Sequence, residues 1–110
     1  MKKSKAGPLK RMQRRIYENK IKKGFNRKNT RAGIYEEIGH LAEEVGEIAS
    51  AHRRNDKPGV FDGLTDLMVF TLGVFEIMGA DADRWMKKIL LQNEKRKYRV
   101  NPDGSNVKIN

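Results

Sequence analysis

Four acidic side chains in the middle of this sequence have the spacing of a divalent-cation site. Glu44 and Glu47 lie three residues apart, so on a helix their carboxylates fall about one turn apart on the same side. Asp62 and Asp66 lie four apart in the most hydrophobic stretch, where an ionised carboxylate is costly to desolvate unless it meets a cation or strong donors. Oxygen donors in a chain without cysteine favour Mg²⁺, with Mn²⁺ as a substitute, so we expect these four residues to hold such an ion.

Two helices must position these carboxylates. Apolar residues between positions 34 and 48 recur at steps of four, three, four and three, which predicts an amphipathic helix whose stripe faces a core. Residues 60–79 are apolar nearly all round and predict a helix that is buried on several sides. If the two pack antiparallel through the short loop at 55–59, both acidic pairs lie the same way from that loop and converge.

Two further helices complete the predicted fold. A basic first helix runs from about Leu9 to Lys22, and Asp81 or Asp83 is suited to cap a fourth helix that becomes basic towards Tyr98. We therefore predict an all-α, four-helix bundle-like fold. Because one nearly all-apolar helix exposes a large hydrophobic surface in so small a monomer, we also expect an obligate oligomer.

Length and composition indicate one domain. The 110 residues, 37% of them hydrophobic, suffice for one modest core, so we expect a single domain over 1–110 with a basic N-terminal extension (about 1–8) and a polar C-terminal tail (about 101–110). The absence of cysteine excludes a disulfide framework and a thiolate metal site. No apolar run reaches the length needed to cross a bilayer, so we expect a cytoplasmic protein without a membrane partner.

The net charge of +10 is distributed unevenly along the chain. Residues 1–31 contain 13 Lys and Arg against one acid and residues 84–110 contain 8 against two, whereas residues 32–83 contain 3 against 11 acids. A cation bound in this acidic middle would neutralise phosphate charge, while basic side chains steady the leaving group, which is the chemistry of a phosphoryl-transfer site. The candidates for that second role are Lys88, Arg96, Lys97 and Arg99.

Four short segments connect the chain to a known family: Gly-Phe-Asn at 24–26, Glu-Glu-Val-Gly-Glu at 43–47, Asp-Gly-Leu-Thr-Asp at 62–66 and Asn-Glu-Lys-Arg-Lys-Tyr-Arg at 93–99. In their order and spacing they make residues 24–100 resemble the MazG-like branch of the all-α NTP pyrophosphatase superfamily. The family signature is E-x-x-E followed one helix later by E-x-x-D, and Glu44, Glu47 and Asp66 fill three of its four positions. Gly63 stands where the family usually has glutamate, and we expect Asp62, one residue earlier, to supply the missing ligand.

The resemblance implies Mg²⁺-dependent hydrolysis of a (deoxy)nucleoside triphosphate between its α and β phosphates, giving the monophosphate and pyrophosphate. We expect Glu44, Glu47 and Asp66 to be catalytic, with Glu47 orienting the attacking water. Members of the family are dimers or tetramers with sites at subunit contacts, so the resemblance also implies a homo-oligomer. It further implies contacts to substrate from the C-terminal segment and a base pocket walled by the first helix and its loop; the candidates are Lys88, Asn93, Arg96, Lys97 and Tyr98 for the first and Phe25 and Asn26 for the second.

Each of these features also has an ordinary structural interpretation. Glu44 and Glu47 alone fit a solvated helix face, and Asp62 fits a helix N-terminus, where the macrodipole favours an acid. Asp66 resists this interpretation because it lies a turn further into the helix, among apolar neighbours. His40, one turn before Glu44, is either a ligand, a base contact or, most simply, an exposed histidine.

Two other classes of function compete with hydrolysis. The basic ends fit a helical nucleic-acid-binding or toxin-partner module with an inert acidic middle, but no aromatic-interleaved surface or helix-turn-helix accompanies the charge, so we do not expect a nucleic-acid partner. Gly63 is also compatible with a catalytically inactive relative that only assembles. Metal binding separates an enzyme from such a relative.

Overall fold

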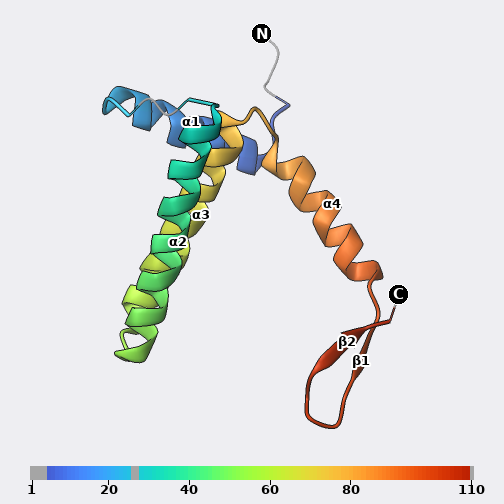
Figure 1. Ribbon diagram of the computed structural model, residues 1–110. Coiled ribbons are helices and arrows are strands. Elements are labelled where there is room, and N and C mark those ends of the chain that lie inside the picture. Colours follow the sequence, from blue (N-terminus) through green and yellow to red (C-terminus); the bar gives the residue numbers. More distant parts are fainter. Residues whose placement is uncertain (1–4, 26–27, 110) are drawn as a thin grey trace.

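Helices dominate the computed structural model, which describes residues 5–25 and 28–109 (Figure 1). The predicted all-α fold with four helices is confirmed. Within the described residues, no helix has the length and hydropathy to span a membrane. Residues 1–4 of the predicted N-terminal extension lie outside the described residues. The elements are α1 (Pro8–Lys22), α2 (Arg31–Arg53), α3 (Lys57–Ile77), α4 (Ala82–Lys95), β1 (Tyr98–Val100) and β2 (Asn106–Lys108).

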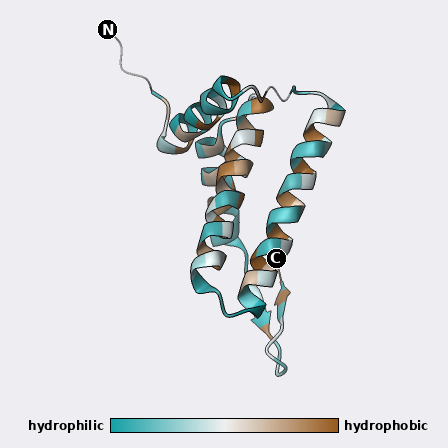
Figure 2. Cartoon of the chain, turned by 90° about the vertical axis from the view of Figure 1, so that its left-hand side faces the viewer, coloured by the Kyte–Doolittle hydropathy of each residue, from teal (hydrophilic) through white to brown (hydrophobic). Residues whose placement is uncertain are grey.

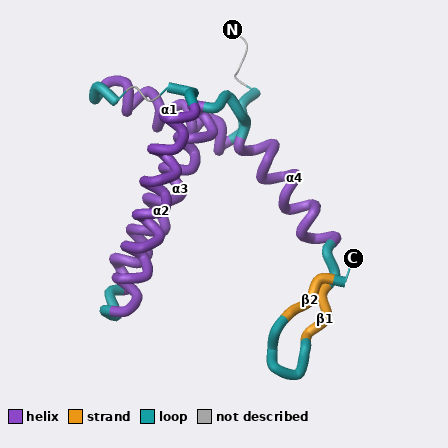
Figure 3. The backbone as a smooth tube through the Cα atoms, in the orientation of Figure 1, coloured by secondary structure: helices purple, strands orange, loops and turns teal. Residues whose placement is uncertain are grey.

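Helices α2 and α3 form an antiparallel pair, the arrangement that the two acidic pairs require (Figures 1 and 3). Thr30 and Asp56 cap the two helices, each accepting a hydrogen bond from the backbone N–H three residues later, at 3.1 and 3.0 Å. Between the helices, Asn55 takes a left-handed conformation with φ 58°, which turns the chain back. Because α3 begins at Lys57, the connection is shorter than the loop predicted at 55–59.

The apolar stripe of α2 is only partly covered. Ile34, Leu41 and Ile48 are half-buried, whereas Ile38 and Val45 are 50% and 55% exposed. The prediction that the whole stripe faces a core is therefore wrong for a single chain, because α3 alone packs along this helix. Hydrophobic residues recur along both helices of the α2–α3 pair (Figure 2). Other exposed apolar side chains on α3 and α4 are Phe61, Leu64, Met68, Val69, Trp85, Met86, Ile89, Leu90 and Leu91.

A buried glutamine fastens α1 across the end of this helix pair. Gln13 is 0% exposed, and its Nε2 donates to Ala80 O (2.9 Å) and to Glu76 Oε1 (3.2 Å). Its Oε1 accepts a hydrogen bond from Ala82 N (2.7 Å). Lys10 Nζ forms a salt bridge of 2.7 Å with the same Glu76 oxygen. One polar side chain thereby joins α1 to the end of α3 and the start of α4.

Helix α4 starts against α1 and then extends away from α2 and α3 (Figures 1 and 3). Asp81 caps it by accepting a hydrogen bond from Asp83 N (3.0 Å), as one of the two predicted caps. Asp83 has another role: its carboxylate accepts hydrogen bonds from Leu9 N (3.1 Å) and Lys10 N (2.8 Å) at the start of α1. A residue of α4 therefore supplies the N-terminal cap of α1.

The C-terminal segment forms an antiparallel hairpin where no strand was predicted. Helix α4 ends at Lys95, before the basic continuation predicted towards Tyr98. At the turn, Asp103 accepts hydrogen bonds from the hydroxyl (2.6 Å) and backbone N–H (2.9 Å) of Ser105, which hold the pKa of Asp103 below its ordinary value. The segment predicted as a polar tail, about 101–110, thus contains a turn and a strand. Its Pro-Asp-Gly sequence is typical of a turn and could have predicted one here.

Candidate active site

Glu44 on α2 is the most perturbed of the predicted metal ligands. It is half-buried, its Oε2 atom is fully buried, and within residues 5–25 and 28–109 no group donates a hydrogen bond to that atom. Burial, followed by the negative charges of Glu47, Asp66 and Glu43, raises the pKa of the Glu44 carboxyl above its ordinary value. A cation bound here would relieve both the burial of the charge and the repulsion among the carboxylates.

Two of the other predicted ligands, Glu47 and Asp66, lie near enough to Glu44 for their charges to act on it. Glu47 follows Glu44 by three residues on α2, and Asp66 reaches the same region from α3, since both charges act on Glu44. We call Glu44, Glu47 and Asp66 the carboxylate cluster. Asp62 is exposed on α3 and is not among the charges that raise the pKa of Glu44. In the described parts of the chain, no group of three or more His, Asp or Glu side chains is positioned to hold a metal ion by itself.

The carboxylate cluster nevertheless fits a hard divalent cation. Mg²⁺ is usually bound through one or two carboxylates and completes its shell with waters and substrate phosphates, so a full protein cage is not required. The buried Oε2 of Glu44, which lacks a donor in the described structure, is the observation that favours a cation over a solvated helix face. The cluster has the donor atoms to hold Mg²⁺ and leaves the remaining ligands to substrate and water.

Gly63 lies at a close approach between α3 and α2. It is buried, and a Cβ atom built on it would lie 2.6 Å from Cγ1 of Ile48. Any side chain at this position therefore requires Ile48 to move, and a β-branched residue in a helix has essentially one favourable rotamer. The departure from the family's glutamate is thus matched by packing, because Ile48 occupies the space that a side chain at position 63 would enter.

We expect Gly63→Ala to lower the free energy of unfolding by about 1–3 kcal/mol, because the added methyl group overlaps Ile48. Ile48→Ala leaves a cavity and costs about 2–5 kcal/mol alone, but in the double variant the methyl group added at position 63 fills part of that space. Urea denaturation of the two single variants and the double variant should therefore give less than the sum of the single losses. Additive losses would contradict this packing. Gly46→Ala is the control, since a Cβ atom added there meets nothing within 4 Å and helix propensity alone favours alanine.

A cavity of about 470 Å³ lies between α1, α2 and α3. His40, one turn before Glu44 on α2, lines it, and its ring stacks on Phe70 with centroids 6.0 Å apart and planes 19° apart. The structure therefore places His40 in the wall of this cavity. Phe25 also lines this cavity, as expected for a base pocket, whereas Asn26 lies outside the described residues.

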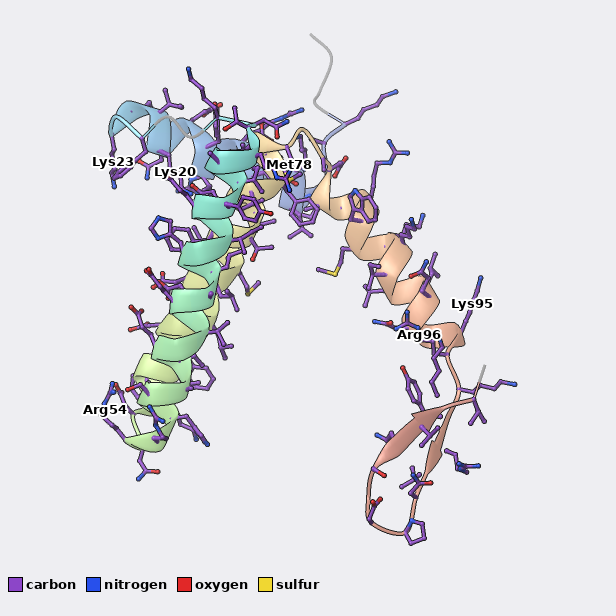
Figure 4. All side chains as sticks on the ribbon, in the orientation of Figure 1. Lys20, Lys23, Arg54, Met78, Lys95 and Arg96 are labelled. Carbon is purple, nitrogen blue, oxygen red and sulfur yellow. The ribbon has the colours of Figure 1, made fainter. Side chains whose placement is uncertain are left out.

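Sequence reasoning missed three charged residues of this cavity, Glu37, Lys20 and Lys23. Glu37 on α2 is 4% exposed, and Lys20 Nζ from α1 lies 3.9 Å from its Oε2 and 5.0 Å from the centre of the Phe70 ring. Figure 4 shows Lys20 on the part of α1 that lies beside the start of α2. A signal existed for Glu37, because it precedes His40 and Glu44 by three and seven residues and so shares their helix face. No sequence signal distinguished Lys20 from the many other basic residues of α1.

The predicted substrate contacts of the C-terminal segment lie elsewhere. Figure 4 shows Arg96 at the far end of α4, away from α2 and α3. Its Nη1 donates to Asn93 Oδ1 (3.1 Å), and Lys88 Nζ lies 4.6 Å from the centre of the Trp85 ring. Lys97 and Tyr98 follow α4 and lead into the hairpin. The described part of one chain therefore separates these residues from the carboxylate cluster.

One comparison with known proteins identifies the family. A family model described as PRA-PH, phosphoribosyl-ATP pyrophosphohydrolase, matches residues 9–93, which include α1 to α3 and nearly all of α4. No curated protein and no solved structure matches the chain significantly. The matched family lies in the same all-α NTP pyrophosphatase superfamily as MazG, and its members are pyrophosphohydrolases, which hydrolyse a phosphoric anhydride. The match covers most of the chain, including every residue of the carboxylate cluster, and so this chain belongs to the phosphoribosyl-ATP pyrophosphohydrolase family.

Proposed function

We propose that this protein is a MazG-like enzyme that hydrolyses a (deoxy)nucleoside triphosphate to the monophosphate and pyrophosphate in the cytoplasm. The observation that carries the proposal is the buried Oε2 of Glu44, which lies beside Glu47 and Asp66 and accepts no hydrogen bond from the described residues. Such an arrangement lowers the stability of the metal-free protein and favours the binding of a cation. The family match supports the pyrophosphohydrolase chemistry, and the substrate is our proposal.

Glu44, Glu47 and Asp66 would hold Mg²⁺ or Mn²⁺, with Asp62 as the fourth proposed ligand from α3. When bound, the ion neutralises phosphate charge and lowers the pKa of a bound water. Glu47, which is more exposed than Glu44 on the same helix, orients the attacking water and accepts its proton. Water is added across the anhydride between the α and β phosphates, the bond between them breaks, and pyrophosphate leaves with support from basic side chains.

Product analysis tests this proposal. Purified protein is incubated with each canonical NTP and dNTP and with phosphoribosyl-ATP, the compound in the family's name, in Mg²⁺ and in EDTA. We expect metal-dependent formation of monophosphate and pyrophosphate from at least one nucleoside triphosphate. If phosphoribosyl-ATP alone is hydrolysed, this compound and not a nucleoside triphosphate is the substrate. Absence of turnover of every compound, with either metal, would favour an inactive relative, and Gly63 is the departure that favours that second candidate.

We further propose that the active enzyme is a homo-oligomer in which α4 and the hairpin of one copy reach the carboxylate cluster of another. Two observations support this: the exposed apolar faces of α2, α3 and α4, and the separation of Arg96 and its neighbours from the cluster within one chain. A composite site of this kind would unite the carboxylates with the predicted phosphate contacts. It also covers apolar surface that is unusually extensive for a monomer.

Subunit complementation checks this arrangement. Asp66→Asn and Arg96→Ala are each expected to be nearly inactive alone. In a co-expressed mixture, a mixed dimer keeps one site with an intact cluster and an intact arm, so roughly a quarter of the wild-type activity should return if subunits pair at random. Sedimentation analysis confirms that the variants assemble. Failure of assembled mixtures to regain activity would show that each chain uses its own arm or none.

A further inference from the structure

Helix α1 brings one ammonium group into the cavity that it forms with α2 and α3. Lys20 lines this cavity, and its side chain is only 23% exposed. Its Nζ lies 3.9 Å from Oε2 of Glu37 and 5.0 Å from the centre of the Phe70 ring. An ammonium group has three N–H donors, and neither of these two contacts is a hydrogen bond. In the described part of the chain, Lys20 therefore keeps donors that a ligand can use.

A glycine of α3 leaves the space in which this ammonium group lies. Gly73 is buried, and a Cβ atom built on it would lie 3.0 Å from Lys20 Nζ. On the other side, Glu37 is buried and already engaged, by Lys20 and by a further interaction within the chain. Protein kinases hold the lysine that contacts their nucleotide's phosphates through an ion pair of the same kind with a glutamate. The arrangement around Lys20 is therefore one that suits a phosphate contact.

The charged groups of this cavity favour an anionic ligand. Lys23 also lines it, and Figure 4 shows Lys20 and Lys23 at the end of α1. The rings of Tyr17 and Phe25, which line the cavity too, would by themselves suit a planar base. Two ammonium groups, set against one carboxylate that is already engaged, instead favour a ligand that accepts charge-assisted hydrogen bonds, as phosphate does.

Two residues of the cavity wall lie one helix turn from the carboxylate cluster. His40 precedes Glu44 by four residues on α2, and Phe70 follows Asp66 by four residues on α3, which is about 6 Å along each helix. The contacts of Lys20 with α3 place its ammonium group about one to two turns from Asp66, or roughly 5–10 Å along the helix. A single phosphate held at the cluster does not span this distance, whereas the terminal phosphate of a triphosphate extends towards it.

We propose that Lys20 binds the terminal phosphate of the substrate and supports pyrophosphate as it leaves. The inference rests on the proposed hydrolysis at the carboxylate cluster. Negative charge grows on the leaving phosphates as the anhydride bond breaks, and a fixed ammonium group stabilises that charge. Gly73 is a positioning residue, because it leaves the space that the ammonium group occupies. The contact is made to phosphate, so it does not depend on the base, and a nucleoside diphosphate, which ends one phosphate earlier, lacks it.

Calorimetry of the full chain with inorganic pyrophosphate in Mg²⁺ tests this contact without requiring turnover. Lys20→Met should weaken pyrophosphate binding by about 10- to 100-fold, the usual effect of losing a hydrogen bond between charged groups. Lys22→Met is the matched control, because Lys22 is an exposed lysine of the same helix outside this cavity, and it should bind within about threefold of wild type. In kinetic assays, Lys20→Met should lower kcat/KM at least about tenfold more for a triphosphate than for the corresponding diphosphate. Circular dichroism shows whether each variant is folded.

Gly73→Ala separates ligand binding from stability. The added methyl group would crowd the Lys20 ammonium group, whereas the next neighbour, Cγ2 of Ile16, lies at an ordinary contact distance of 3.7 Å. Alanine favours a helix over glycine, so the unfolding temperature should stay the same or rise. Pyrophosphate binding should nevertheless weaken by about three- to tenfold, because the ammonium group is displaced. Unchanged binding in this variant would overturn the positioning role of Gly73.

Several outcomes would overturn the phosphate contact of Lys20: no binding of pyrophosphate by wild type, unchanged binding in Lys20→Met, or equal losses in Lys20→Met and Lys22→Met. The last would show that only the general positive charge of α1 matters. Weaker binding of AMP with intact binding of pyrophosphate in Lys20→Met would place the nucleoside in the cavity and would also overturn it. Hydrolysis assays separate this inference from the proposed function. Turnover of triphosphates at the wild-type rate in Lys20→Met refutes the phosphate contact only, whereas Lys20-dependent binding of pyrophosphate by a protein that hydrolyses no nucleotide refutes the hydrolysis only.

Discussion

Replacing Asp66 by asparagine is expected to lower kcat for nucleoside triphosphate hydrolysis by at least about a thousandfold, the size of effect that several kcal/mol of lost metal stabilisation produces. The helical fold should be retained, because Asp66 is exposed on α3. In metal-free protein the substitution should leave the unfolding temperature unchanged or slightly higher, since it removes a charge that repels Glu44. Steady-state kinetics and thermal unfolding, each in Mg²⁺ and in EDTA, measure both effects.

The increase in unfolding temperature caused by Mg²⁺ distinguishes loss of metal from general damage. Wild type should be stabilised by Mg²⁺ through binding to the folded state, and Asp66→Asn should lose this increase. Glu18→Gln, which removes an exposed acid of α1, should keep both activity and the Mg²⁺ response. Normal turnover in Asp66→Asn would remove Asp66 from the proposed site.

The raised pKa of Glu44 determines the direction in which stability and Mg²⁺ affinity change with pH. Because the folded state binds this proton more tightly than the unfolded state, the stability contributed by protonation of Glu44 is fully present below the ordinary carboxyl pKa and is lost as pH rises through the raised value. Mg²⁺ must displace the same proton, so its apparent affinity should fall as pH falls through that range. Calorimetric Mg²⁺ titrations at several pH values should show this fall in wild type. Glu44→Gln should remove the proton linkage together with most of the binding.

Replacing Gln13 by alanine is expected to be the most destabilising of the single substitutions on α1. The change removes the hydrogen bonds to Ala80 O and from Ala82 N and leaves both backbone groups without this partner, at a cost of about 3 kcal/mol. The corresponding fall in Tm is roughly 15 °C for a domain of this size. Thermal and urea unfolding monitored by circular dichroism measure the loss.

Gln92→Ala is the matched control for this prediction. Gln92 is exposed on α4, so its truncation should change the free energy of unfolding by no more than about 0.5 kcal/mol. A small effect of Gln13→Ala would show that other contacts hold α1 in place. Lys10→Met tests the neighbouring salt bridge to Glu76, which is partly exposed and should contribute about 1 kcal/mol or less.

Local signals were sufficient to predict the helices and the proximity of Glu47 and Asp66 to Glu44. The periodic apolar residues of α2 and the caps at Thr30 and Asp81 report on backbone geometry within a few residues of themselves. Glu44 and Glu47 are neighbours on one helix turn, so their proximity is a property of spacing alone. Asp66 needed only the antiparallel return of α3 through a short connection.

Features that depend on distant residues were not predictable in this way. Gln13 is an ordinary polar residue of a basic helix until Ala80 and Ala82 fold against it. The close approach of Ile48 to Gly63 depends on the packing of two helices. The exposure of Ile38 was missed because periodicity shows that a face is apolar without showing whether the same chain covers it. Lys20 meets Glu37 only after α1 has crossed the other helices.

The capping of α1 by Asp83 has a consequence for the order in which the chain acquires structure during synthesis. Gly7 provides no side-chain cap, and an isolated helix of 15 residues is only marginally stable in water, so α1 leaves the ribosome early but gains its cap only when Asp83 has emerged. The hairpin of α2 and α3 is local and can form first. Helix α1 is therefore the first of the four helices to be made, and its N-terminal cap is completed only after the start of α4 has been made.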